Sequence, residues 1–323
     1  MSQLLEKIIM RFNKNTNKIE KLTTGLLAVD YVTDGGIPRG EVVEIYGENG
    51  VGKTTLSLII AKTFLEKVPD KAVVYIDTEY SLDSEWCKKN GLDLEKYMEE
   101  KKFFVLNPDT LDDALNLALD AVKTNEVSLV VIDSIAALAP AEMFDTDDPI
   151  AYNKPGTTAK KQTNFFGVVG KLLYETKTTL LVINQMRANI SPYGAATITP
   201  GSYAFKHKTA LRIEAKRDDY INGRAEPTGI LVKLKVVKNK HGIPYRVGNV
   251  AITFKNGMDI VESNIDMMIN FGILKRSGAY YTVGEDKVQG RKNLYDYFIQ
   301  HPDVYERYVK ETLEYIEKLK DMD

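Results

Sequence analysis

The stretch Gly47-Glu48-Asn49-Gly50-Val51-Gly52-Lys53-Thr54 lies between residues 41–46, which have strand character, and the apolar, helix-like residues 56–65. The pattern Gly-x4-Gly-Lys-Thr in this setting is typical of a loop that binds nucleotide phosphates. Glycine permits positive φ and lets backbone N–H groups turn toward a phosphate, and the helix start adds a partial positive charge. An ordinary glycine-rich turn would show all these features only by accident. The stretch therefore predicts an α/β nucleotide-binding fold.

The same loop predicts how the nucleotide is held. Lys53 is expected to place its charge between the β- and γ-phosphates of ATP, and the Thr54 hydroxyl is expected to bind Mg²⁺. The expected contacts of the nucleotide within this segment are Glu48, Asn49, Gly50, Val51, Gly52, Lys53, Thr54 and Thr55.

Length and composition limit the class of protein. The 323 residues can form one large domain and a smaller one, and 43 basic against 45 acidic side chains leave a net charge of −2. The single cysteine, Cys87, cannot form an intramolecular disulfide, which fits a reducing compartment. The three histidines are scattered without metal-ligand spacing, and the sequence has no bilayer-length apolar run or signal peptide. We expect a cytoplasmic protein that does not use a membrane.

Continuous apolar runs separated by helical patterns predict the core. Strands are expected at 72–76, 103–106, 128–132 and 178–183, with a helix at 111–123. Such runs are typical of a parallel sheet covered on both faces. Later β-rich runs, with turns between them, predict an antiparallel extension of the sheet at 212–216, 229–238 and 250–254.

The two ends of the chain are expected to form separate parts. Residues 2–12 read as a short amphipathic helix that packs either on its own domain or on a neighbouring subunit. After Gly257 the pattern becomes α+β, with helices near 260–270, 293–300 and 305–320 and a small hairpin at 280–283. The expected division is an N-terminal segment at 1–19, an ATPase core at 20–257 and a small domain at 258–323.

Three polar side chains follow predicted parallel strands on the edge that carries the phosphate loop. Ligands bind beyond the carboxyl ends of such strands. Asp133 is expected to hold Mg²⁺, although an Asp at this place is often only a helix cap. Glu79 is expected to polarise the attacking water, the alternative being an acid that stabilises a helix start. Gln185 has no charge but can donate a hydrogen bond to a γ-phosphate, which suits a sensor of ATP against ADP.

Two residues soon after Glu79 complete the expected nucleotide contacts. Asp83 and Trp86 lie close to Glu79 in the sequence, and the Trp86 ring offers a flat face for adenine. The alternative for Trp86 is a buried core position.

Two long loops next to the predicted nucleotide site suggest a second ligand. They lie between Pro140 and Gln162 and between Met186 and Tyr203, and are rich in glycine and hydroxyl groups. Residues 186–246 contain 12 Lys and Arg against 4 Asp and Glu, a local charge of +8 in a chain of net charge −2. This basic segment is expected to bind the phosphate backbone of a nucleic acid. The alternative is a basic face that is simply exposed to solvent.

The order of these motifs closely resembles the bacterial RecA recombinase family, over about residues 20 to 318. The similar blocks are Gly-Gly-Ile-Pro-Arg-Gly and Glu-Ile-Tyr-Gly (35–47), the phosphate loop, Ile-Asp-Thr-Glu-Tyr-Ser-Leu-Asp (76–83), Val-Ile-Asp-Ser-Ile-Ala-Ala-Leu (131–138), Ile-Asn-Gln-Met-Arg (183–187), Val-Lys-Asn-Lys (237–240), Ser-Gly-Ala-Tyr-Tyr (277–281) and Gln-Gly-Arg-Lys-Asn (289–293). The phosphate loop is widely shared among NTPases, whereas Val-Lys-Asn-Lys and the C-terminal block are much more specific.

The resemblance implies a DNA-dependent ATPase with a RecA-like core. It implies a helical homo-oligomeric filament with ATP and Mg²⁺ at subunit interfaces, which pairs single-stranded with double-stranded DNA and exchanges strands. Glu79 matches the family's catalytic glutamate, and Gln185 matches the residue that links the γ-phosphate to the second DNA loop. Lys238 and Lys240 match lysines that reach ATP from the neighbouring subunit. Residues 262–323 match a domain that captures duplex DNA.

The expected DNA contacts lie in the two loops. On this resemblance they are Lys160, Thr163, Arg187, Ala188, Asn189, Ile190, Tyr193, Gly201, Ser202 and Tyr203. The chain departs from the family here, because Gly167 replaces a second arginine and the later loop is one residue shorter. The N-terminal helix is also shorter, and the usual acidic tail is missing, so subunit docking and autoinhibition are expected to differ. A divergent, phage-type recombinase fits these differences.

Two other functions compete with a recombinase. A ring-forming motor of the same fold, such as a replicative helicase, usually takes an arginine from its neighbour instead of the pair at 238 and 240. A non-catalytic, ATP-gated scaffold predicts negligible DNA-stimulated phosphate release and no loss when Glu79 is changed to glutamine.

Overall fold

The computed structural model describes residues 19–148, 154, 156–188 and 197–320. The predicted helix at 2–12 lies outside these residues. Within them, the helices are α2 Leu27–Val32, α3 Lys53–Lys67, α4 Ser84–Lys89, α5 Leu94–Glu99, α6 Leu111–Lys123, the 3₁₀ turn η1 Ala141–Met143, α7 Thr157–Thr176, α8 Tyr203–Lys208, α9 Ile260–Asn270, α10 Arg291–Gln300 and α11 Pro302–Leu319.

A large mixed sheet forms the centre of the molecule. Among the described residues, nine strands follow the order β13-β12-β11-β10-β3-β7-β6-β4-β5. Their bounds are β3 Val42–Gly47, β4 Ala72–Asp77, β5 Phe103–Leu106, β6 Val127–Asp133, β7 Thr179–Gln185, β10 Leu211–Ile221, β11 Gly229–Asn239, β12 Val247–Thr253 and β13 Gly257–Asp259. The strands from β10 to β5 pair in parallel, and β11, β12 and β13 pair antiparallel. The predicted parallel sheet with an antiparallel extension is confirmed, with β10 as the strand that joins both parts.

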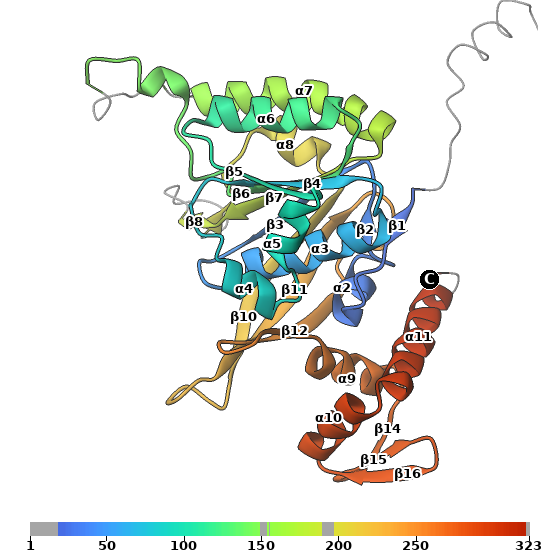
Figure 1. Cartoon of the computed structure of the whole chain (residues 1–323). Coiled ribbons are helices and arrows are strands. Elements are labelled where there is room, and N and C mark those ends of the chain that lie inside the picture. The colour runs from blue at the N-terminus through green and yellow to red at the C-terminus, as the bar shows by residue number, and fades with distance from the viewer. Residues whose placement is uncertain (1–18, 149–153, 155, 189–196, 321–323) are drawn as a thin grey trace, which may run out of the picture.

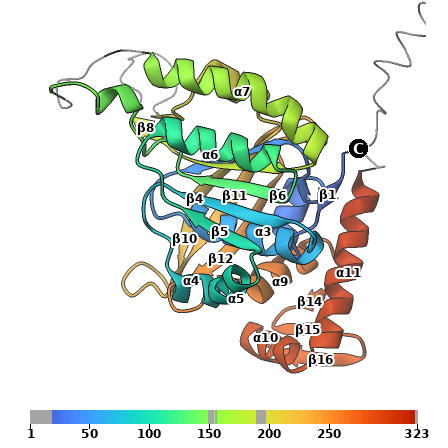
Figure 2. The same ribbon diagram turned by 45° about the horizontal axis from the view of Figure 1, so that its top comes forward.

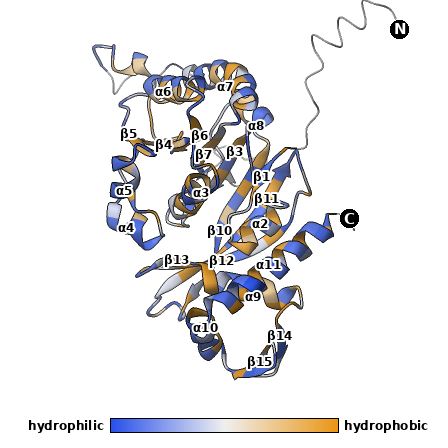
Figure 3. Ribbon diagram, turned by 45° about the vertical axis from the view of Figure 1, so that its right-hand side comes forward, coloured by the Kyte–Doolittle hydropathy of each residue, from blue (hydrophilic) through white to orange (hydrophobic). Residues whose placement is uncertain are grey.

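Helices cover both faces of this sheet, as Figures 1 and 2 show. On one face α6, α7 and α8 pack over alternate strand residues, with Phe166 and Phe205 fully buried between them. On the other face α2 and α3 pack over the remaining strand residues, with Phe64 fully buried. Because parallel strands are buried on both sides, their sequences are continuous apolar runs. Figure 3 shows this concentration of hydrophobic residues in α3 and the central strands.

The C-terminal part continues from the edge of the sheet. Helix α9 packs on β12 and α2, and α11 packs on α2 and α9. A three-stranded sheet, β14 Lys275–Ser277, β15 Tyr280–Val283 and β16 Asp286–Gln289, lies beside α10. The sequence predicted only a hairpin here, because β14 is polar and wholly exposed and therefore lacks an apolar signal.

Four short strands complete the described secondary structure. Lys21–Leu22 (β1) pairs with Ile37–Pro38 (β2), and Arg187–Ala188 (β8) pairs with Thr197–Ile198 (β9). The β8–β9 pair brings the two ends of the later glycine-rich loop together. Residues 189–196, between these strands, lie outside the described part of the chain.

A buried carboxylate near α2 predicts a pH-dependent stability. Asp30 is fully buried and accepts hydrogen bonds from the N–H groups of Thr24 and Gly25, at 2.7 and 3.0 Å, and from the Thr24 hydroxyl at 3.0 Å. Burial nevertheless raises the pKa of Asp30 to about 6. The Asp30 carboxyl group therefore stays protonated to higher pH in the folded protein than in the unfolded chain. Proton binding by Asp30 thus favours the folded state at low pH, and this stabilisation is lost as the pH rises through about 6.

We expect Asp30→Asn to remove this pH dependence. Relative to the variant, the wild-type free energy of unfolding should fall by up to about 3 kcal/mol between roughly pH 4 and 7. Urea unfolding at several pH values measures this difference, with Asp70→Asn at an exposed position as the control. A difference between wild type and Asp30→Asn that stays constant with pH would contradict the assignment.

Candidate nucleotide and DNA site

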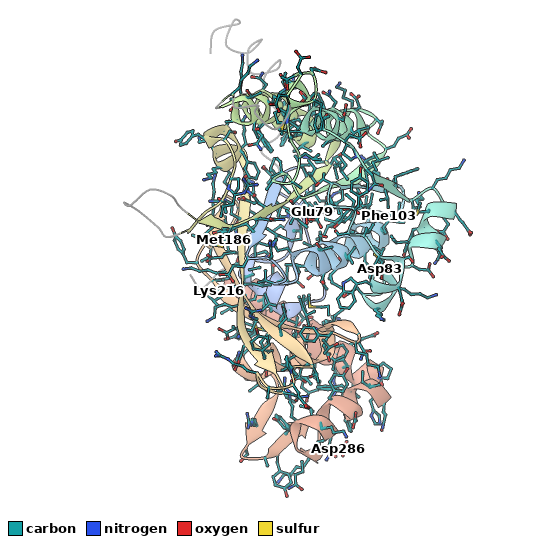
Figure 4. All side chains as sticks on the ribbon, turned by 90° about the vertical axis from the view of Figure 1, so that its left-hand side faces the viewer. Glu79, Asp83, Phe103, Met186, Lys216 and Asp286 are labelled. Carbon is teal, nitrogen blue, oxygen red and sulfur yellow. The ribbon has the colours of Figure 1, made fainter. Side chains whose placement is uncertain are left out.

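Strand register brings the predicted catalytic side chains to one edge of the sheet. Gly47 is level with Gln185, and Asp77 is level with Asp133. Glu79 follows β4 by two residues. Figure 4 shows Glu79 and Met186 at this edge, whereas Asp286 lies in the C-terminal part. The carboxyl ends of β3, β4, β6 and β7 therefore bring these side chains to the same edge of the sheet.

The phosphate loop takes a shape that requires glycine at several positions. Gly50 and Gly52 have φ values of 71° and 83°. A Cβ on Gly47 would lie 2.1 Å from the Ala215 carbonyl oxygen, and one on Gly52 would lie 2.2 Å from Ile252 Cδ1. Around Gly50 there is open space where a Cβ would stand. The loop leads directly into the 15-residue helix α3, whose N-terminal N–H groups face the same space. This cradle fits a phosphate chain.

Lys53 lies at the start of α3 with most of its side chain buried. Its ammonium group donates to the carbonyl oxygens of Gly47, at 3.2 Å, and Glu48, at 2.7 Å. Burial lowers its pKa, and the nearby carboxylates of Asp133 and Glu79 oppose that shift. The cation is thus held within the loop and is available to phosphate oxygens.

Asp133 and Thr54 form an oxygen pair that suits Mg²⁺. Thr54 Oγ1 donates to Asp133 Oδ2 over 2.7 Å, and Tyr75 Oη donates to the same oxygen over 2.8 Å. Burial raises the Asp133 pKa to about 6, although both hydrogen bonds oppose the shift. A hydroxyl beside a carboxylate next to the phosphate cradle is the donor set that Mg²⁺ takes in P-loop sites. Sequence reasoning missed Tyr75, although a tyrosine in the buried run Val73–Ile76 was a usable signal, because its hydroxyl needs a partner.

Glu79 is held by two hydrogen-bond donors. Ser134 Oγ donates to Glu79 Oε1 at 2.5 Å, and Gln185 Nε2 donates to the same oxygen at 2.7 Å. Asp77 accepts the backbone N–H groups of Glu79 and Leu82, at 3.3 and 2.9 Å, and so shapes this segment. Sequence reasoning missed the part played by Ser134, because nothing in a single sequence shows that this hydroxyl reaches across from β6.

These groups surround a cavity of about 360 Å³. Trp86 lines it from α4, and its indole N–H donates to Thr55 Oγ1 at 3.2 Å. Three apolar side chains that the sequence did not predict also line the cavity. They are Ile230 of β11, Ile252 of β12 and Phe254, which follows β12. The full lining is Asn49, Gly50, Gly52, Lys53, Thr54, Thr55, Glu79, Trp86, Asp133, Ile183, Gln185, Ile230, Ile252 and Phe254.

Three predicted nucleotide contacts lie outside this lining in the described structure. Asp83 precedes α4, where its carboxylate accepts the Trp86 backbone N–H at 2.6 Å and so caps the helix. Val51 is buried beneath the loop, and the Glu48 side chain is exposed. Glu48 contributes its carbonyl oxygen, which binds Lys53.

Lys238 and Lys240 lie far from the phosphate loop of their own subunit. Leu234 is level with Gly47 across β10, and Lys238 lies four residues further along β11, about 13 Å of strand. The Lys238 ammonium group donates to the carbonyl oxygens of Lys206 and His207, at 2.8 and 3.0 Å, and that of Lys240 donates to Lys208 O at 3.1 Å. Both lysines thus bind the C-terminal end of α8.

The predicted DNA residues that the structure describes gather near the α7 start and the later loop. Lys160 and Thr163 are exposed on α7. Arg187 is exposed and donates a hydrogen bond to Ala136 O at 3.0 Å. This bond joins the start of the later loop to the segment that leads into the earlier loop. Ala188 belongs to β8 by its backbone. Asn189, Ile190 and Tyr193 lie outside the described residues.

The end of the later loop leads into α8. Gly201 has a φ of 129°, and a Cβ there would lie 2.8 Å from Phe205 Cδ1. Ser202 caps α8 by accepting the Phe205 N–H at 3.1 Å, and its own N–H donates to Gln162 Oε1 at 3.0 Å. The Tyr203 side chain is 85% exposed. An aromatic ring and basic side chains are thus presented to solvent beside the nucleotide edge, as nucleic-acid binding requires.

The described structure contains neither a metal-ligand cluster nor a membrane-spanning helix. Among the residues that it describes, no group of three His, Cys, Asp or Glu side chains could hold a metal ion. None of the helices within residues 19–320 that the structure describes is long and apolar enough to cross a membrane.

Comparison with known proteins agrees with this geometry. Residues 3–259 match the RecA N-terminal domain family, and residues 263–317 match the RecA C-terminal domain family. Protein RecA of Lactobacillus johnsonii is 32% identical over 309 residues, which cover 94% of this chain and 83% of that protein. Protein RecA of Malacoplasma penetrans is 32% identical over 324 residues, which cover 97% and 95%.

A solved structure shows the same fold. The crystal structure of the RadB recombinase aligns with a TM-score of 0.55 and 22% identity, covering 73% of this chain and 98% of that one. The phosphate cradle, the Glu79–Gln185 contact and the two matched domains lead to one conclusion. The chain belongs to the RecA family, the DNA-dependent ATPases that carry out homologous recombination and DNA repair.

Proposed function

We propose that this protein forms a helical filament on single-stranded DNA, binds ATP and Mg²⁺ between adjacent subunits, and exchanges strands with duplex DNA in the cytoplasm. The observation that carries the proposal is the 2.7 Å hydrogen bond from Gln185 to Glu79. Gln185 is the last residue of β7, and the later loop begins directly after it. Its hydrogen bond therefore joins Glu79, at the nucleotide cavity, to the start of the segment proposed to bind DNA.

Each side chain at the nucleotide has a role that its position supports. Lys53 and the N–H groups of the phosphate loop bind the phosphate oxygens of ATP. Thr54 and Asp133 would hold Mg²⁺, which would neutralise negative charge on the phosphates of ATP. Glu79 orients the attacking water and accepts its proton, while Ser134 and Gln185 hold the carboxylate in place. Trp86 offers its ring to the base.

DNA is bound on the surface that carries the two loops. Lys160, Arg187 and the basic strands after Met186 supply positive charge, and Tyr203 supplies an exposed ring. Phosphate contacts of this kind release counterions, so binding should weaken steeply with salt. The C-terminal part from Glu262 onward is proposed to capture duplex DNA.

A strand-exchange assay with and without ATP tests the proposal directly. We expect exchange of a labelled strand only when ATP, Mg²⁺ and single-stranded DNA are all present. Electron microscopy with an ATP analogue and single-stranded DNA should show helical filaments. Closed hexamers in place of filaments would favour a ring motor and contradict the recombinase proposal.

We further propose that Lys238 and Lys240 act on the ATP of the neighbouring subunit. Their position at the opposite end of the strands from the phosphate loop keeps them away from their own nucleotide. Two cations delivered across the interface would neutralise charge in the transition state and make hydrolysis depend on assembly.

Mixed assemblies test this role. Subunits with Lys238→Ala and Lys240→Ala should be inactive alone, as should subunits with Glu79→Gln. Random equal mixing places an intact Glu79 site beside intact lysines at about one interface in four, so roughly a quarter of the wild-type hydrolysis should return. Lys235→Ala, at an exposed position on the same strand, is the control. No recovery at any mixing ratio would contradict action across the interface.

A further inference from the structure

A buried charged group lies in the central strand, outside the nucleotide cavity. Glu44 in β3 is fully buried, and its Oε2 accepts a hydrogen bond from Arg212 Nε, while its Oε1 accepts one from Asn184 Nδ2 at 3.0 Å. A buried carboxylate is costly unless a charged partner and hydrogen bonds compensate it. Nothing in the phosphate loop itself requires an acid three residues before Gly47, so Glu44 needs another explanation.

Both partners of Glu44 also hold the ends of the later loop. Asn184 Nδ2 donates a second hydrogen bond to Pro200 O, at 2.7 Å, and Asn184 Oδ1 accepts the Gln185 N–H at 3.0 Å. Arg212 Nη2 donates to Thr199 Oγ1 at 3.2 Å. The later loop leaves the sheet after Gln185, and Thr199 and Pro200 lie near its other end. Both ends of the loop therefore contact Asn184 or Arg212, the two hydrogen-bond partners of the Glu44 carboxylate.

Rigid elements hold this group in place. Arg212 is level with Glu44 on the neighbouring strand β10, and Asn184 is level with Tyr46 on the other neighbour, β7. The Arg212 guanidinium also lies over the Tyr46 ring, 5.0 Å from its centre. Side chains held between three parallel strands are positioned more precisely than side chains on loops.

We infer that Glu44, Asn184 and Arg212 form a clamp that couples the conformation of the later loop to the position of Gln185. Glu44 and Arg212 are positioning residues. Among the described contacts, neither side chain belongs to the lining of the nucleotide cavity. Glu44 acts through its hydrogen bond with Asn184, and Arg212 acts through its hydrogen bond with Thr199. The inference rests on the proposed function, in which the loop binds DNA and Gln185 contacts the γ-phosphate. Coupling of this kind works in both directions, so DNA binding changes the nucleotide site and the nucleotide changes DNA affinity.

The clamp is tested with two variants that remove it in different ways. Glu44→Gln combined with Arg212→Gln removes both charges together and leaves no buried ion unpaired. Thr199→Val removes only the oxygen that Arg212 Nη2 reaches, with nearly unchanged volume, and keeps the test valid if the double variant fails to fold. Glu214→Gln, two residues beyond Arg212 on β10, is the matched control.

Two ratios are measured for each variant in the full-length protein. One is ATP hydrolysis with single-stranded DNA divided by hydrolysis without it. The other is DNA affinity with a non-hydrolysable ATP analogue divided by DNA affinity with ADP. We expect the double variant to lose about tenfold in both ratios and Thr199→Val about threefold, with DNA-independent hydrolysis within about twofold of wild type.

Each result has a definite meaning. Unchanged ratios in folded variants would overturn the clamp, and so would an equal loss of DNA-independent and DNA-stimulated hydrolysis, since that is the signature of a merely structural role. The wild-type protein tests the proposed function separately. If DNA does not stimulate its hydrolysis at all, the proposed function fails before the clamp is tested.

Discussion

Lys53→Ala is expected to abolish ATP-dependent filament extension and strand exchange. The Lys53 ammonium group is held inside the phosphate loop by two carbonyl oxygens, and burial already lowers its pKa. Phosphate oxygens that reach this partly desolvated charge would stabilise it further. Removing a charged group that meets the transferring phosphoryl group lowers the rate by about a hundredfold or more.

Phosphate release and binding of a fluorescent ATP analogue measure this loss. The control is Lys62→Ala on the same helix, where Lys62 forms an ion pair with Glu66 at 2.7 Å on a partly exposed face. We expect Lys62→Ala to retain both activities. Normal strand exchange by Lys53→Ala would refute the assigned site.

Glu79→Gln is expected to stop hydrolysis while ATP still binds. The amide can accept the hydrogen bonds that Ser134 and Gln185 donate, but it cannot take a proton from water at neutral pH. General-base catalysis contributes about a hundredfold to ten-thousandfold, so kcat should fall by roughly that range with little change in nucleotide affinity.

Single-turnover hydrolysis and filament formation separate the possible outcomes. A Glu79→Gln protein that extends on DNA with ATP but does not release phosphate supports the assignment. Glu85→Gln, an exposed change on α4, should behave like wild type. Wild-type DNA-stimulated hydrolysis by Glu79→Gln would contradict the catalytic role of Glu79, whereas negligible DNA-stimulated hydrolysis by the wild-type protein would favour the ATP-gated scaffold.

Local patterns in the sequence predicted most of the core. The apolar runs became β3, β4, β6 and β7 within about one or two residues, because strands buried on both faces are mostly apolar along their whole length. Helix α6 occupies the predicted residues 111–123. Its Thr110 cap and the acidic first turn mark where it begins.

Contacts between distant segments were harder to foresee. Asp83 reads equally well as a nucleotide contact or a helix cap, and only the fold shows its carboxylate on the Trp86 N–H. The bonds of Ser134 to Glu79 and Tyr75 to Asp133 join neighbouring strands that are about 55 residues apart in the chain. The places of Lys238 and Lys240 came from the family resemblance, since no local pattern marks a residue that serves another subunit.

The opposite positions of the phosphate loop and the two lysines have a consequence for assembly. If one edge of each subunit offers a nucleotide and the other edge offers the cations that complete it, the two contacting surfaces are unlike, and subunits associate head to tail. Any open assembly then has one fewer complete site than it has subunits. At one end of the assembly, the last subunit has an ATP that no neighbouring lysines reach. At the other end, the last subunit has lysines that meet no neighbouring ATP. The two ends therefore differ in their rates of hydrolysis and subunit loss.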